Sequence, residues 1–212
     1  MTKSANLSPA ERPLPLSQQL AEIAAELGPD RLTFTDLAAH LDARAWGGLL
    51  FLFAAINVLP LPPGTSAFFA IPLLIVSGQM VFGRATPWFP ARLDRRGVSK
   101  QLLRRLVNKM EGAERHIERL LKPRLPRLTS HFAERIIGLV CFFLALIAAI
   151  PIPLFHVAPA GAILLFGLSL IYRDGALVLV AAAAAVASIA IDALIVGSGV
   201  AALSYAASWF SR

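Results

Sequence analysis

Apolar residues gather in two similar blocks along the chain, and in each block two apolar runs are separated by prolines. The four runs are 46–59, 66–82, 136–150 and 157–172. The separating prolines are Pro60, Pro62 and Pro63 in the first block and Pro151 and Pro153 in the second. The blocks share their hydropathy and the position of the break more than residue identity. The pattern predicts one helical hairpin that is used twice.

Each run is short for a helix that crosses a bilayer. The 14 residues of 46–59 would form about 21 Å of α-helix, against a hydrocarbon core of roughly 30 Å. Proline lacks a backbone N–H and clashes with the preceding turn, so the backbone at each break is expected to be non-helical. Such backbone survives in a membrane only where it is buried in protein or lines a wet cavity. The breaks therefore predict re-entrant hairpins, with spanning helices joined by surface loops as the alternative.

The C-terminal part carries the most continuous apolar run. Residues 176–196 contain Asp192 as their only ionisable group, which predicts a spanning helix. The next stretch, 200–210, is too short to cross a bilayer unaided, and its Tyr205 and Trp209 suit an interfacial anchor.

The N-terminal region is polar, and 17–27 and 35–45 predict two short helices, the second capped by Thr33 and Asp36. We expect this region to cover the hairpins on the cytoplasmic side. The whole pattern predicts an all-α polytopic membrane protein. Its parts are a cap (1–45), a hairpin (46–83), a basic loop (84–135), a second hairpin (136–173) and a C-terminal transmembrane helix with its tail (174–212).

Composition supports this class, because 57% of the residues are hydrophobic and only 16% are charged. Charge predicts the orientation. Residues 84–135 contain 14 Lys or Arg and five Asp or Glu, and such a loop stays in the cytoplasm under the positive-inside rule. Both hairpins would then open toward the cytoplasm and the N-terminus would lie there too. The two halves are therefore expected to be parallel copies and not inverted ones.

Within the basic loop, apolar residues at near-helical spacing over 99–121 predict an amphipathic basic helix with Ser99 as its N-cap. Basic side chains of the loop are candidates for contacts with anionic lipid headgroups. They are Arg95, Arg96, Arg104, Arg105 and Arg119. The alternative is a topology signal with a solvated helix face. Nucleic acid is not an expected partner, because no recognised fold or stacking motif accompanies the charge.

Two stretches carry a resemblance to a known family. The first, at 57–90, matches the family pattern at Asn57, Pro60, Pro62, Pro63, Gly64, Pro72, Gln79, Gly83, Pro87, Trp88 and Pro90. The second, at 150–180, matches at Pro151, Pro153, Pro159 and the turn 173–175, and departs from the pattern at His156. Over about 17–210 the chain resembles the ExoD exopolysaccharide-synthesis family. The resemblance implies a multi-pass protein of the bacterial inner membrane linked to exopolysaccharide production, and it implies no particular reaction.

Polar residues after the first break are candidates for binding an anion. Gly64, Thr65 and Ser66 open the helix that follows the break. Hydroxyls and free backbone N–H groups at a helix N-terminus could hold a phosphate or a carboxylate. The alternative is a routine N-cap.

Other polar residues are single candidates with two readings each. Asp192 is either a proton or cation site or a helix-end residue near the outer interface. Asn57 and Gln79 would contact a solute through their amides or form interhelical hydrogen bonds. His156 would exchange protons after the second break or serve as a hydrogen-bonded packing residue. The turn 173–175 is expected to pair its own charges.

An enzyme is disfavoured, because the chain has no nucleophile elbow, phosphate-binding Gly-Lys loop or HExxH pattern. No cofactor or metal is expected, since the histidines have no zinc-like spacing. Two functions remain. The first is a small transporter or channel, either as a monomer or as a homodimer. Its hairpins would surround a site for an ion or for the phosphate of a polyprenyl-type lipid carrier. The second is a non-catalytic membrane subunit whose basic loop and cap organise exopolysaccharide enzymes or anionic lipid.

Overall fold

The computed structural model describes residues 31–41, 45–58, 65–84, 86–95, 97–99, 101, 104, 125–150, 152 and 155–210. These residues are helical apart from connections and one two-residue ladder, so the all-α class is confirmed. Three sets of predicted features lie outside the described residues: the helix 17–27, most of the helix 99–121, and the five prolines of the breaks.

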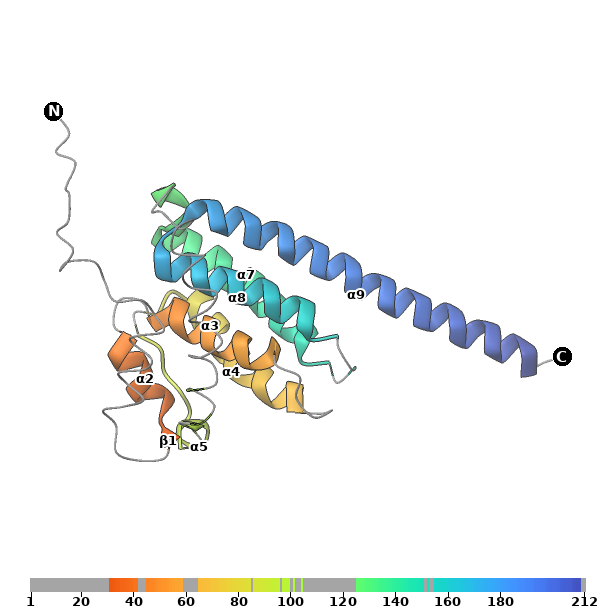
Figure 1. Ribbon diagram of the computed structural model, residues 1–212, viewed down its shortest axis with the longest axis horizontal. Coiled ribbons are helices and arrows are strands. Elements are labelled where there is room, and N and C mark those ends of the chain that lie inside the picture. The colour runs from red at the N-terminus through yellow and green to blue at the C-terminus, as the bar shows by residue number, and fades with distance from the viewer. Residues whose placement is uncertain are drawn as a thin grey trace.

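Four helices form a bundle: α3 (Ala45–Val58), α4 (Thr65–Val81), α7 (His131–Ala148) and α8 (Val157–Tyr172). Helix α3 packs along α8 and α4 packs along α7, antiparallel in both cases (Figure 1). The predicted bounds agree within one residue for α3, α4 and α8. Helix α7 starts earlier than predicted because Ser130 caps it, its Oγ accepting a hydrogen bond from the N–H of Ala133 at 3.4 Å.

Glycine lets α3 and α8 approach closely. A Cβ atom added to Gly47 would lie 2.8 Å from the carbonyl oxygen of Gly167, 2.9 Å from Cβ of Leu170 and 3.0 Å from the backbone nitrogen of Ile171. Two of these neighbours are backbone atoms that cannot turn aside as a flexible side chain would. The contact therefore requires a residue without a side chain.

Helices α4 and α7 meet through an equivalent contact. A Cβ atom added to Gly138 would lie 3.1 Å from the carbonyl oxygen of Ser77, 2.6 Å from Cβ of Met80 and 3.1 Å from the backbone nitrogen of Val81. Gly138 follows Gly47 by 91 residues. In both contacts the neighbours are the oxygen of one residue, the Cβ three residues later and the nitrogen four residues later. The two helix pairs thus pack alike down to individual atoms.

Helices α4 and α8, one from each pair, also end in the same way. Gly83 follows α4 with φ of 66°, and Arg173 follows α8 with φ of 51°. In each case the N–H of the next residue donates to the carbonyl five residues earlier, at 3.2 Å after α4 and 3.0 Å after α8. This is the hydrogen bond of a Schellman ending. Glycine adopts the left-handed conformation readily, whereas arginine adopts it at a cost.

Helix α9 (Gly175–Phe210) is 36 residues long and projects beyond the bundle (Figure 1). Its buried positions alternate at spacings of three and four along its first half: Val178, Ala181, Ala185, Ser188 and Asp192. The predicted separation between 176–196 and 200–210 is wrong, because the helix continues through both. A glycine inside a helix costs only about 1 kcal/mol, so the two glycines between these stretches do not end it.

Helix α2 (Phe34–Leu41) begins with the predicted cap. The N–H of Asp36 donates to Oγ1 of Thr33 at 3.1 Å, and that hydroxyl donates to the Asp36 carboxylate at 2.5 Å. Three buried rings then join α2 to α3 and to the segment after α4, with centroids 4.9 to 6.1 Å apart: Phe34, Phe53 and Phe89.

The remaining elements are short. They are β1 (Arg31–Leu32), its antiparallel partner β2 (Val98–Ser99), α5 (Ala91–Asp94) and the 3-10 helix η3 (Pro126–Thr129). Ser99, the predicted N-cap, is the last residue of β2. Asp94 ties α5 to α2 by accepting hydrogen bonds from the N–H and the hydroxyl of Thr35, each at 2.9 Å.

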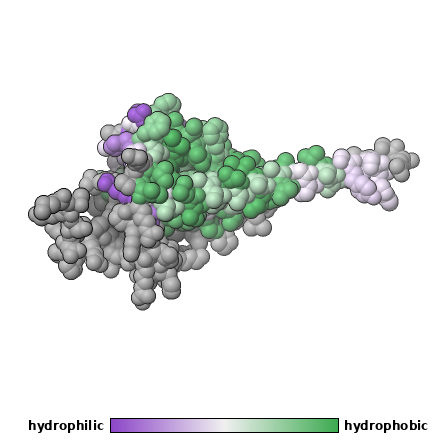
Figure 2. Space-filling model, turned by 90° about the horizontal axis from the view of Figure 1, so that it is seen from above, coloured by the Kyte–Doolittle hydropathy of each residue, from purple (hydrophilic) through white to green (hydrophobic). Residues whose placement is uncertain are grey.

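Large apolar side chains cover much of the outside of the bundle and of α9 (Figure 2). On α7 they form one outward stripe at helical spacing: Phe132, Ile136, Leu139, Phe143 and Leu146. Among the described residues, two helices are long and apolar enough to cross a membrane, namely α7 and the part Gly175–Ala202 of α9.

Candidate functional site

The helix ends that adjoin the proline breaks lie together. Because α3 and α7 run antiparallel to α8 and α4, the C-termini of α3 and α7 share one end of the bundle with the N-termini of α4 and α8 (Figure 1). We call this the break end. The opposite end, which carries Arg84, Arg135 and Arg173, is called the basic end.

Asn57 lies at the break end, in the last turn of α3, and is fully buried. Its Nδ2 donates to the carbonyl oxygen of Phe53 at 3.1 Å, whereas its Oδ1 has no hydrogen-bond partner among the described residues. A buried acceptor without a partner costs about 1–3 kcal/mol. A ligand that donates a hydrogen bond or positive charge to Oδ1 would remove this cost.

His156 and Asp192 lie at one level of the bundle. His156 immediately precedes the 16 residues of α8, and Asp192 follows the start of α9 by 17 residues. The two helices are neighbours joined by a two-residue turn. Because His156 and Asp192 lie nearly the same number of helical residues from that turn, both lie at the break end. Nδ1 of His156 and Oδ1 of Asp192 are buried and have no partner among the described residues. The other oxygen of Asp192 accepts a long hydrogen bond, 3.5 Å, from the Ser188 hydroxyl.

The break-end residues share a level but not one face. Helix α8 packs against α3 and also against α9, so Asn57 and Asp192 approach it on different helices. Thr65 and Ser66 form the first turn of α4 at the same end, and Gly64 lies outside the described residues. The structure therefore brings most of the predicted site residues to one end of the bundle without showing them around one cavity.

Gln79 lies away from the breaks, near the basic end of α4. Its Nε2 donates to the carbonyl oxygen of Trp88 at 2.7 Å, and its Oε1 accepts from the N–H of Trp88 at 2.8 Å. Both halves of the amide thus hold the segment after α4. The structure thus places Gln79 away from the break and gives its amide a structural contact with Trp88.

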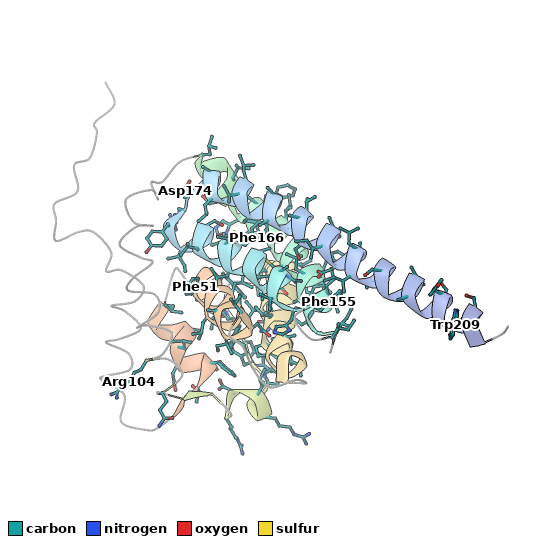
Figure 3. The ribbon with its side chains drawn as sticks, turned by 45° about the vertical axis from the view of Figure 1, so that its right-hand side comes forward. Phe51, Arg104, Phe155, Phe166, Asp174 and Trp209 are labelled. Atoms are coloured by element: carbon teal, nitrogen blue, oxygen red, sulfur yellow. The ribbon has the colours of Figure 1, made fainter. Side chains whose placement is uncertain are left out.

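Of the arginines predicted to contact lipid headgroups, Arg95 and Arg104 are exposed. Arg104 lies at the edge of the molecule in Figure 3. The other three, Arg96, Arg105 and Arg119, lie outside the described residues.

The basic end holds a cavity of about 710 Å³. Its walls come from α2, the start of α3, the end of α4, the start of α7 and the turn after α8. The charged or titratable residues among the described ones that line it are Arg84, His131, Glu134, Arg135 and Arg173. We call this space the basic cavity. Sequence reasoning missed it, although a basic residue adjoins the same end of three separate apolar runs.

Local structure positions the arginines of the basic cavity. The guanidinium of Arg135 lies against Gly83, where an added Cβ would come within 2.5 Å of its Nη2. The guanidinium of Arg84 lies 5.9 Å from the centroid of the Trp88 ring, within cation–π range. Trp88, whose backbone is hydrogen-bonded to Gln79, therefore also positions the guanidinium of Arg84.

The turn after α8 contributes to both the start of α9 and the basic cavity. Asp174 caps α9, its Oδ1 accepting from the N–H of Ala176 at 2.9 Å, and Arg173 lines the basic cavity. The cap uses one of the two carboxylate oxygens of Asp174, and the expected pairing of charges within the turn stays a prediction.

The part of the chain that the structure describes defines a helical protein with an apolar exterior, and two of its helices could cross a membrane. The chain belongs to the ExoD family. The family profile described as "Exopolysaccharide synthesis, ExoD" matches residues 16–194, which confirms the resemblance seen at 57–90 and 150–180.

Two curated relatives agree with this assignment. Protein ExoD of Rhizobium meliloti (strain 1021) is 27% identical over 168 residues, which cover 77% of this chain and 70% of the relative. An uncharacterized protein of Synechocystis sp. is 25% identical over 185 residues, which cover 85% of each chain. No solved structure matches the chain. The family is linked by its description to exopolysaccharide synthesis.

Proposed function

We propose that the protein is a multi-pass inner-membrane transporter or channel that serves exopolysaccharide synthesis. Its two hairpins re-enter the membrane from the cytoplasm, and the break end lies within the bilayer. The observation that carries the proposal is the length of α9 relative to the bundle. Helix α8 has 16 residues, about 24 Å, whereas α9 has 36 residues, about 54 Å.

About 27 Å of α9, the part after Asp192, extends past the break end. Figure 3 shows Phe155, beside the start of α8, partway along α9, and Trp209 near its far end. Exposed apolar side chains continue along this projecting part: Leu194, Ile195, Val196 and Val200. In water each would forgo about 1.5 kcal/mol or more of burial energy.

A tilted α9 that crosses the bilayer removes this cost. The apolar projecting part then lies in lipid, and Tyr205 and Trp209 lie at the far interface, where such rings concentrate. The break end, level with Asp192, is consequently inside the hydrocarbon region. This arrangement supports re-entrant hairpins over spanning ones.

The equivalent contacts of Gly47 and Gly138 and the two Schellman endings support a duplicated hairpin with both copies pointing the same way. Paired broken segments that meet inside a membrane are the usual place of a transporter site. Oδ1 of Asn57 and Oδ1 of Asp192 are acceptors. Unpartnered acceptors favour a cation, a proton or a hydroxyl-bearing solute over a phosphate at the break end.

Thiol accessibility tests the depth of the break end. In a Cys141→Ala background, Val58→Cys and Ile152→Cys place probes beside the two breaks, at exposed positions. Tyr205→Cys is the control for the outer side and Gln101→Cys for the cytoplasmic side. We expect an impermeant reagent added outside to label only Tyr205→Cys. Labelling of both break-end probes from outside, as fast as Tyr205→Cys, would mean spanning hairpins and would contradict the proposal.

Flux measurements test the activity. Purified protein in vesicles is expected to pass protons or a monovalent cation down a gradient, and Asp192→Asn is expected to abolish the flux while the protein still inserts and folds. The Asn side chain keeps the size and one acceptor of the carboxylate but removes its charge. Equal flux in Asp192→Asn and the unaltered protein would contradict a charge-dependent path through this residue.

A non-catalytic assembly subunit is the second candidate, and the exposed Arg95 and Arg104 favour it. Complementation of exopolysaccharide production separates the two functions. Under the transport proposal, Asp192→Asn does not restore exopolysaccharide production. A variant in which Arg104, Arg105 and Arg119 are all neutralised does restore it. The reverse result would support organisation of exopolysaccharide enzymes or anionic lipid at the cytoplasmic surface.

A further inference from the structure

The basic cavity carries an excess of positive charge. Three guanidinium groups line it, those of Arg84, Arg135 and Arg173, with Glu134 as the carboxylate among its described lining residues. Oε2 of Glu134 lies 3.2 Å from Nδ1 of His131, so within the described part of the chain Glu134 pairs with His131 and not with an arginine. Among the described residues, therefore, no ion pair joins an acid to any of these three arginines.

The chemistry of the walls suits a phosphate ester. Guanidinium groups bind phosphate oxygens through two parallel hydrogen bonds and keep their charge at any physiological pH. A volume of about 710 Å³ falls within the range of roughly 300–1,000 Å³ that is usual for organic ligands. Trp46 and Met80 add apolar wall, so the cavity has room for the group that carries the phosphate.

The backbone at Arg173 gives an independent reason to assign a role to its side chain. Arg173 has φ of 51° at the position where the equivalent helix of the first hairpin has Gly83 at 66°. Glycine suits this conformation better. An arginine in this left-handed conformation is locally strained, and such strain concentrates at functional sites.

We propose that the basic cavity binds a phosphate ester, presented by an anionic lipid headgroup or by a soluble phosphorylated ligand. Arg84, Arg135 and Arg173 hold the phosphate, and Trp46 lies beside the attached group. The site is separate from the proposed transport path, because it lies at the opposite end of the bundle from Asn57 and Asp192. Failure of the flux experiment would leave it untouched.

Trp46 supplies a direct readout. The chain has three tryptophans, so Trp88→Phe and Trp209→Phe leave Trp46 as the only indole reporter. Its fluorescence is followed while the full-length protein is titrated with glycerol 3-phosphate in detergent. In parallel, the protein is placed in nanodiscs of phosphatidylcholine alone or of phosphatidylcholine mixed with phosphatidic acid.

We expect a saturable fluorescence change. Arg135→Gln and Arg173→Gly should each lower the affinity derived from it about tenfold or more, because each removes a charge-assisted hydrogen-bonding group. Arg92→Gln is the matched control, since Arg92 is exposed and does not line the cavity. Arg173→Gly is the decisive variant, because glycine fits the backbone there. It should melt at the same temperature as the unaltered protein or higher while its binding falls.

A response to glycerol 3-phosphate assigns a soluble ligand, a response confined to phosphatidic acid assigns a lipid headgroup, and both results support the phosphate site. No response to either probe would overturn it. So would an equal loss in Arg92→Gln, which would reveal general attraction by the basic surface, or unchanged binding in Arg173→Gly and Arg135→Gln.

Discussion

At the residue scale, Gly47 and Gly138 set the distance between the paired helices. Alanine at either position would press its Cβ against the partner helix at 3.1 Å or less. We expect Gly47→Ala and Gly138→Ala each to destabilise the protein by about 1–3 kcal/mol, the usual cost of overpacking a close contact. Thermal unfolding of the purified protein in detergent measures the change.

Gly161→Ala is the control for that experiment. Gly161 is also helical, yet an added Cβ would meet nothing within 4 Å. Alanine there should leave stability unchanged or raise it by up to about 1 kcal/mol through helix propensity. A similar loss in all three variants would show that the effect comes from changing a helical glycine and not from the two interhelical contacts.

At the element scale, the ring of Phe89 docks the segment after α4 onto α2 and α3. Its ring lies 5.2 Å from Phe34 and 6.1 Å from Phe53, and it is buried. We expect Phe89→Ala to lower the free energy of unfolding by about 3 kcal/mol, the lower range for removing a buried phenyl ring. The neighbouring Trp88→Ala should cost much less, because Trp88 is 58% exposed. Comparable losses in the two variants would mean that Phe89 does not form the docking contact.

Most elements could be predicted from local pattern. The predicted run 157–172 is α8 itself, and Thr33 with Asp36 caps α2 as expected. Such features depend on residues a few positions apart. The end of the C-terminal helix does not follow from local pattern, because α9 continues from the apolar run 176–196 through 200–210 to Phe210.

At the scale of the whole molecule, the straight course of α9 predicts the topology. Helix α9 starts at the basic end and runs past the break end without turning back (Figure 1). A reporter placed at Gln101 should therefore lie in the cytoplasm, and one placed after Arg212 should lie outside. Paired fusions to a fluorescent protein active inside and a phosphatase active outside measure this. Activity of the same reporter at both positions would rule out a single crossing by α9.

The sequence by itself determined the helical class, the apolar runs interrupted by prolines, the excess of basic residues in the central loop and the family. Each of these depends on hydropathy, proline positions and charge, which act locally or through simple counts. Asn57, His156 and Asp192 could be chosen in this way because a polar residue within or beside an apolar run stands out.

Tertiary structure alone decided which of those residues lie level with one another, which polar atoms lack partners, and that Gln79 holds Trp88. It also decided that Arg84, Arg135 and Arg173 line one cavity. These features depend on the register in which separate helices pack. That register is set by close contacts such as those of Gly47 and Gly138, between residues far apart in the chain, which no local pattern specifies.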